Sequence, residues 1–216
     1  IGTIVLLNIP NIQQAMSVFV AEELSEVLNT KVVIGRINMG LLNRIIIDDV
    51  LLDDQSGQEM LKVTRLSAKF DIMPFFKGKI SISSVQLFGF NINLRKETPD
   101  SPPNFKFVLD AFASKDTVKK ENSLDLRINS ILIRRGRMSY HVLSEEETPG
   151  KFNAKHIQLQ NIIANISLKA LSKDSLNLGI KRLSLDEKAS GFSLKKMSLK
   201  LVANNKQTNI DNFTIE

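Results

Sequence analysis

The chain has 216 residues, which is enough for one large domain or two small ones with a substantial hydrophobic core. It contains no cysteine, which excludes disulfides and thiolate metal sites. The net charge is +6, but the basic residues are spread in ones and twos, and only residues 118–120 and 134–137 are locally basic. Because Ile, Leu, Val and Phe dominate and stand between Asn and Ser, the composition favours a β-rich protein.

Residues 1–9, IGTIVLLNI, are apolar and precede the first predicted helix. They are too few to cross a bilayer, which takes about 20 residues. The segment is either the remnant of a membrane anchor or signal segment, or an ordinary edge strand. Because the chain also stops within a strand-like pattern, NFTIE, we expect a fragment of a longer protein in which residues 10–216 form one domain.

Residues 10–29 are predicted to form an amphipathic helix, because their apolar residues recur at helical spacing. The polar side carries Glu22, Glu23 and Glu26 and no Lys or Arg, which argues against binding to an anionic membrane surface. We therefore expect this helix to cap one end of a sheet. The residues expected to pack against that sheet are Ile12, Met16, Phe19 and Val27.

Strand patterns fill residues 31–94 and run again from 124 to the end of the chain. Between them, ETPDSPP at 97–103 breaks the sheet, and a second short helix is predicted to follow. Asn104 is its expected N-cap. Its apolar residues at helical spacing are Phe105, Val108, Leu109 and Phe112.

A six-residue pattern recurs along the predicted strands: apolar, two mostly polar residues, apolar, any residue, apolar. In a regular strand the first two apolar residues would point to opposite faces, whereas one extra residue, a β-bulge, would return them to one face and bend the strand. Strands that all bend alike would form a trough with an apolar concave face. The alternative is a short turn at each site, linking small strands of a sandwich. The copies start at residues 47, 63, 82, 128, 154, 180, 194 and 210.

The fold class expected is therefore mainly β, an elongated, curved antiparallel sheet forming an open groove, with an N-terminal amphipathic helix and a second short helix. An acyl chain is a suitable filler for such a groove, because its transport needs shielding from water more than polar recognition. The predicted lining residues are Ile82, Val85, Leu87, Ile128, Ile131, Ile133, Leu183, Leu185, Met197 and Leu199.

Polar clusters in the sequence favour no catalytic or metal site. His141 and His156 are the only histidines, and neither stands in a nucleophile–base signature, so no enzyme is expected. His156 occupies a polar slot of the repeated pattern and is expected to be solvated. The carboxylates of DDVLLDD, residues 48–54, are assigned to a solvated bend and a hairpin turn rather than to Ca²⁺. Nucleic acid is not an expected partner, because the basic residues lack interleaved aromatic platforms.

The order of motifs resembles the N-terminal region of the TamB family, the translocation and assembly module proteins, in the form found in the Bacteroides group. The resemblance covers essentially the whole chain and belongs to the wider AsmA-like set of repeating β-groove proteins. It is carried by an apolar segment, Ile9-Pro10, a helix, VxIGRI, DDVLLDDQSG, the KGKISI strand and PNFKFVLDAF.

The resemblance implies a taco-shaped β-sheet in the periplasm of a bacterial cell envelope, anchored to the inner membrane just before Asn8. It implies a role in phospholipid transport and outer-membrane biogenesis, and no cofactor is expected. It also implies a BamA-like barrel as a partner, bound through regions absent here. The alternative is a scaffold that holds strands of outer-membrane proteins for assembly by strand addition.

Overall fold

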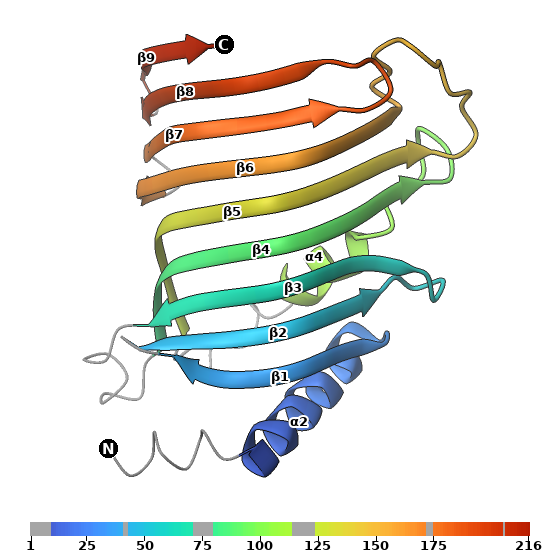
Figure 1. Ribbon diagram of the computed structural model, residues 1–216, viewed down its shortest axis with the longest axis vertical. Coiled ribbons are helices and arrows are strands. Elements are labelled where there is room, and N and C mark those ends of the chain that lie inside the picture. Colours follow the sequence, from blue (N-terminus) through green and yellow to red (C-terminus); the bar gives the residue numbers. More distant parts are fainter. Residues whose placement is uncertain (1–9, 41–42, 71–79, 114–123, 172–174, 205) are drawn as a thin grey trace.

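The computed structural model describes residues 10–40, 43–70, 80–113, 124–171, 175–204 and 206–216, and only the backbone at 70, 80–82, 112–113, 124–128, 169–171 and 175. One nine-stranded sheet, with its strands in sequence order, makes up most of the fold (Figure 1). The elements are α2 (Pro10–Leu28), β1 (Val32–Gly40), β2 (Arg44–Asp53), β3 (Glu59–Phe70), β4 (Ile80–Lys96), α4 (Lys106–Ala113), β5 (Leu124–Val142), β6 (His156–Leu171), β7 (Ser175–Glu187), β8 (Ser193–Asn204) and β9 (Thr208–Ile215).

The predicted fold class is confirmed: the protein is mainly β, with one curved, open sheet and two helices in the described ranges. The sheet is mixed rather than wholly antiparallel, because β4 and β5 pair in parallel. Strands paired in parallel need a crossover connection, and here the connection contains α4. All other neighbouring strands pair antiparallel.

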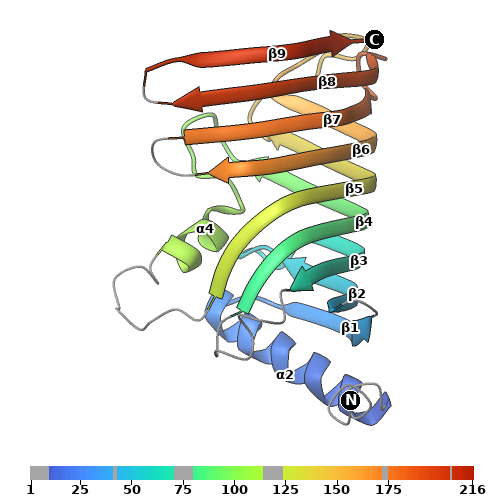
Figure 2. The same ribbon diagram turned by 90° about the vertical axis from the view of Figure 1, so that its left-hand side faces the viewer.

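The strands bend where single residues adopt a left-handed backbone conformation. Asp49 in β2, Gly89 in β4 and Arg135 in β5 have φ angles of 57°, 64° and 55°. The strand register places Asp49 and Gly89 on either side of Thr64, and Arg135 beside Gly89. Each left-handed residue interrupts the alternation of side chains, so the apolar residues on both sides of it share one face. The aligned bends give the sheet its trough-like shape (Figure 2).

Close packing at the bend requires glycine at two positions. A Cβ atom on Gly89 would lie 2.7 Å from the Thr64 hydroxyl oxygen. A Cβ on Gly136 would lie 2.4 Å from the ring of Phe90, which packs over that glycine. The bend is thus fixed by local backbone conformation together with the close approach of side chains on neighbouring strands.

Seven of the eight predicted pattern copies lie within strands. The copy that begins at Ala154 does not, because β6 starts only at His156. A left-handed residue or a register shift falls within the copies that start at 47, 82, 128, 180, 194 and 210. The bends at Gly89, Arg135 and Asn161 lie outside the eight copies, so the pattern found only part of the curvature.

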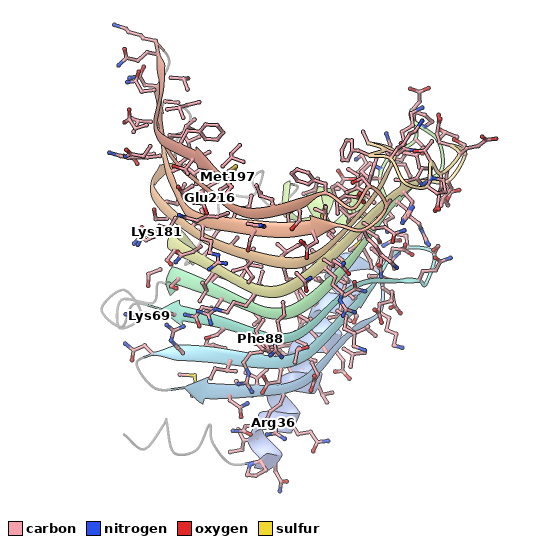
Figure 3. All side chains as sticks on the ribbon, turned by 45° about the horizontal axis from the view of Figure 1, so that its top comes forward. Arg36, Lys69, Phe88, Lys181, Met197 and Glu216 are labelled. Atoms are coloured by element: carbon pink, nitrogen blue, oxygen red, sulfur yellow. The ribbon has the colours of Figure 1, made fainter. Side chains whose placement is uncertain are left out.

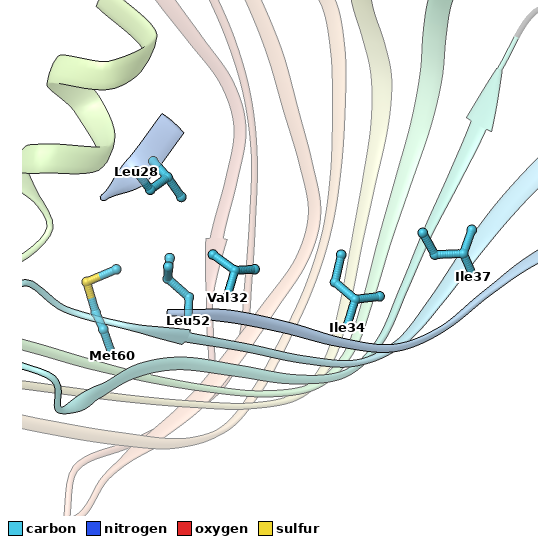
Figure 4. Close-up of a cluster of buried hydrophobic side chains, with 6 residues drawn as sticks. All are labelled: Leu28, Val32, Ile34, Ile37, Leu52 and Met60. Carbon is cyan, nitrogen blue, oxygen red and sulfur yellow. The ribbon is translucent and has the colours of Figure 1, made fainter. Parts of the chain in front are cut away.

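The main hydrophobic core lies on the concave side of β1–β3. Leu28, Val32, Ile34, Ile37, Leu52 and Met60 form its buried centre (Figure 4). Met16, Val20 and Leu24 of α2 and Phe107 and Val108 of α4 pack against this centre. Both helices therefore lie on the concave side: α2 runs beside β1, and α4 packs against the core of β1–β3 (Figures 1 and 2).

The predicted buried face of α2 is partly wrong. Phe19 and Val27 are 63% and 43% exposed, while Met16 packs against the core and Ile12 is half-buried. The sheet instead meets a neighbouring strip of the helix that contains Ser17, which is 1% exposed. Its hydroxyl donates to the Gln13 carbonyl oxygen at 2.8 Å, so this small polar residue is buried without an unpaired group. Because α2 is apolar on more than one side, spacing alone could not identify the buried side.

We expect Phe19→Asp to change the free energy of unfolding by less than about 0.5 kcal/mol, as for other exposed positions. Leu28→Asp in the same helix is expected to lower it by about 3 kcal/mol or more, because Leu28 is 7% exposed and an unpaired charge would be buried there. Urea unfolding followed by circular dichroism compares the two variants. A Phe19→Asp variant as unstable as Leu28→Asp would contradict this placement of α2.

Two predictions about α4 also need correction. Leu109 is 59% exposed, and the helix packs through Phe107, Val108 and Ala111, together with Phe105 just before it. Asn104 does not cap the helix through its side chain, which bonds to the β4 backbone and to a carboxylate in the β2–β3 turn.

Candidate functional site: the concave face of the sheet

A line of directly paired apolar residues crosses the concave face from β1 to β9. Residues directly opposite one another on neighbouring strands point to the same face. The line begins at Ile37, which packs against the core under α2. Eight strand spacings of about 4.8 Å make it about 38 Å long. We call it the central row; it consists of Ile37, Ile47, Leu66, Leu87, Ile133, Ala164, Leu183, Met197 and Ile215.

A second line runs beside the central row from β1 to β8, two residues away on most strands and three residues away on β7. This second row consists of Met39, Ile45, Ala68, Val85, Ile131, Ile166, Ile180 and Leu199. Neither row contains a charged residue. The concave face is therefore continuously apolar across the sheet, including the parallel β4–β5 pair.

The two rows contain most of the predicted lining residues. Leu185 lies on the same face, packed in a smaller core with Val63, Phe90 and Ile162. Ile82 and Ile128 fall where side chains are not described. The predicted residues on the concave face are Val85, Leu87, Ile131, Ile133, Leu183, Leu185, Met197 and Leu199.

Helices α2 and α4 cover the concave face only near β1–β3, and no other helix occurs in the described ranges. Further along the rows the side chains are mostly half-buried, for example Ile131, Leu183 and Met197. Ile210 and Ile215 on β9 are more than half exposed. The concave face thus offers an open apolar surface over the later strands.

The convex face differs, because charged residues stand among its apolar ones. Arg36, Asp48, Arg65, Phe88 and Arg134 are directly paired across β1–β5 on this face. Figure 3 shows Arg36 and Phe88 on the outer side of the bend and Met197 inside it. Arg65 forms an ion pair with Asp48 at 2.6 Å. The two apolar rows of the concave face, which contain no charged residue, therefore form the longer uninterrupted apolar surface.

RRGR, the locally basic stretch at 134–137, is split by the bend. The guanidinium of Arg135 lies 5.1 Å from the centre of the Phe88 ring. Arg135 and Arg137 line a shallow hollow of about 440 Å³ together with Lys62. The hollow lies beside the bend and is separate from the apolar rows.

A buried carboxylate, Asp54, ties α4 to the sheet at one end of the concave face. Its side chain is 2% exposed and lies 2.6 Å from the Arg95 guanidinium. It accepts hydrogen bonds from Ser56, Gln58 and Asn104. Burial alone raises the pKa of Asp54, but the hydrogen bonds from Ser56, Asn104 and Gln58 outweigh it and lower the pKa. The hairpin turn predicted at Asp53 and Asp54 is present, but Asp54 is not solvated.

Glu187 is a second buried carboxylate that accepts several hydrogen bonds, and it lies at the β7–β8 turn. Burial raises its pKa, but hydrogen bonds from Ser190, Gln158 and Ala189 bring it down to about 2. The folded pKa lies below the ordinary value of 4.5, so this carboxylate stabilises the fold above pH 4.5. That contribution is lost as the pH falls from 4.5 toward about 2.

His156 is buried, so the expectation that it is solvated is wrong. Its ring lies beside that of His141, with the two Nδ1 atoms 3.0 Å apart, and Glu147 lies nearby in the following loop. No local pattern indicates this contact, because a connection of 14 residues separates the two histidines and only strand pairing brings them together.

Neither a family model nor a curated protein matches this sequence. None of the helices in the described ranges is long and apolar enough to cross a membrane.

Proposed function

We propose that this chain is part of a non-enzymatic conduit that shields lipid acyl chains, with phospholipids as the class of cargo. The observation that supports it best is the continuity of the central row over nine strands. Beyond β3, no helix in the described part of the chain covers the row. An acyl chain lying across the strands would meet one apolar side chain after another.

The hydrophobic effect is large enough to hold such a ligand. At about 0.8 kcal/mol for each buried CH₂ group, a chain of about 16 carbons gains on the order of 12 kcal/mol on leaving water. Two effects reduce this gain: the acyl chain loses conformational freedom when it binds, and an open groove covers only part of its surface. A moderate net affinity suits a conduit, since cargo must leave each position as well as enter it.

The cellular setting proposed rests on the sequence resemblance. The motifs of this chain resemble those of the TamB family in order and spacing. That resemblance supports a periplasmic location, an inner-membrane anchor and a role in outer-membrane biogenesis. A BamA-like barrel would then be bound by other parts of the full-length protein.

Lipid analysis of the purified protein tests the proposal. We expect phospholipid to co-purify after expression in a Gram-negative host and gentle detergent extraction, and to be detected by native mass spectrometry. An unrelated soluble β protein, purified in parallel, sets the background. Lipid at background level would overturn the conduit, and bound peptides without lipid would favour the assembly scaffold instead.

A further inference from the structure

The strongest polar cluster outside the concave face lies at the β5–β6 connection. His141 near the end of β5 and His156 at the start of β6 are directly opposite in the strand register. Their ring centres are 5.3 Å apart, and their Nδ1 atoms are 3.0 Å apart. The nearer carboxylate oxygen of Glu147 lies 3.8 Å from the His141 Nδ1 atom.

A backbone contact fixes the tautomer of His156. Its Nε2 atom lies 2.9 Å from the Glu145 carbonyl oxygen. A carbonyl oxygen can only accept, so Nε2 carries the hydrogen. In the neutral ring, Nδ1 then has a free lone pair that faces His141. Histidines that bind metal ions are commonly oriented by such a bond from the other ring nitrogen.

The loop around these residues is held by its own hydrogen bonds. The Asn153 side chain donates to the Glu146 carbonyl and accepts from the Lys155 backbone. Lys155 also pairs with Glu145 at 2.6 Å, the residue whose carbonyl orients His156. The position of the buried imidazole is therefore set by the fold.

We propose that His141, His156 and Glu147 form a binding site for one divalent transition-metal ion, with Zn²⁺ as the best fit. Ligand atoms from the three residues all lie within 4.8 Å of one another. Zinc bonds to histidine nitrogen at about 2.0–2.1 Å, so two nitrogens on one tetrahedral ion are separated by about 3.3–3.4 Å. The two Nδ1 atoms are 3.0 Å apart, so a small rotation of either ring would give the separation that the ion needs.

The three residues leave one position of a tetrahedral ion open. Glu147 is exposed, and a hollow of about 230 Å³ adjoins Glu147 and His156. Water fills the fourth position readily in sites of this kind. The bound ion would cross-link β5, β6 and the loop between them, because each element supplies one ligand.

Zinc titration of the tag-free full chain, by calorimetry with a competing chelator, tests the site. We expect one Zn²⁺ per chain. Glu147→Gln should weaken zinc binding by about tenfold or more. Loss of a residue that only supports a metal ligand already lowers metal affinity by about tenfold. Glu146→Gln is the matched control, since this neighbouring carboxylate is exposed and lies outside the cluster. Glu147 is also exposed, so its variant is expected to fold.

Cu²⁺ used as a spectroscopic probe identifies the ligands independently. Pulsed electron paramagnetic resonance should show two imidazole nitrogens, and the chain contains no histidines other than these two. His141→Gln should remove one of the signals. No binding of Zn²⁺ at millimolar concentration, equal weakening by Glu146→Gln and Glu147→Gln, or a Cu²⁺ signal without two imidazoles would each overturn the proposal.

Discussion

Asp54→Ala is expected to lower the free energy of unfolding by about 3 kcal/mol, the low end for removing one partner of a buried ion pair. The substitution leaves the Arg95 guanidinium, which is 19% exposed, without its carboxylate. It also removes an acceptor from Asn104, which links β4 to the segment that leads into α4. Loss of both contacts should loosen α4 from the concave face.

Chemical unfolding at neutral pH measures this effect, with Asp53→Ala as the matched control. Asp53 is the neighbouring residue, half-buried and outside the Asp54 network, so its removal should cost less than about 1 kcal/mol. If the two variants were equally stable, the ion pair and hydrogen bonds of Asp54 would contribute nothing net.

The pH dependence of the same pair gives a further check. The folded pKa of Asp54 is lowered, so its stabilising effect is present above the ordinary value of 3.8 and is lost as the pH falls through the folded pKa. The stability difference between Asp54→Ala and the wild type should therefore shrink below about pH 4. A difference that grew on acidification would contradict the direction of this shift.

The curved sheet could be predicted because its cause is local. A left-handed residue such as Asp49 leaves a mark in the sequence: apolar residues three apart where alternation requires two. The parallel β4–β5 pair leaves no such mark. Both strands have the same apolar pattern in either orientation, and only the crossover through α4 determines their relative direction.

The buried face of α2 and the polar contacts could not be predicted for a different reason. Phe19 and Leu28 both satisfy helical spacing, and only the position of β1 decides which is buried. Asp54 meets Asn104 across 50 residues of sequence, and His141 meets His156 through strand register. Such contacts belong to the tertiary structure, and short-range patterns carry no information on them.

The uneven cover of the concave face bears on the lipid binding that we propose. Near β1–β3 the apolar surface is already occupied by side chains of α2 and α4, which contribute to folding. Over β4–β9 the same rows continue without a helix in the described part of the chain. Acyl chains would therefore bind over the later strands, and the helices would close the β1 end.

Ile131→Asp is expected to remove most of the bound lipid, because Ile131 lies in the second row within the uncovered part. A buried aspartate would lose its hydration, and an acyl chain that avoids it forfeits contact. Losing contact with about four CH₂ groups costs about 3 kcal/mol, or about a hundredfold in affinity.

Leu132→Asp is the matched control, since the next residue along β5 pairs with Gln86 and Asn165 on the convex face. Both variants introduce the same charge into the same strand, one on each face. Lipid content per chain is measured by mass spectrometry, and thermal unfolding and protease resistance confirm that each variant is folded. We expect lipid to remain with Leu132→Asp and to fall to background with Ile131→Asp. Equal lipid content in two folded variants would show that acyl chains do not lie along the concave face.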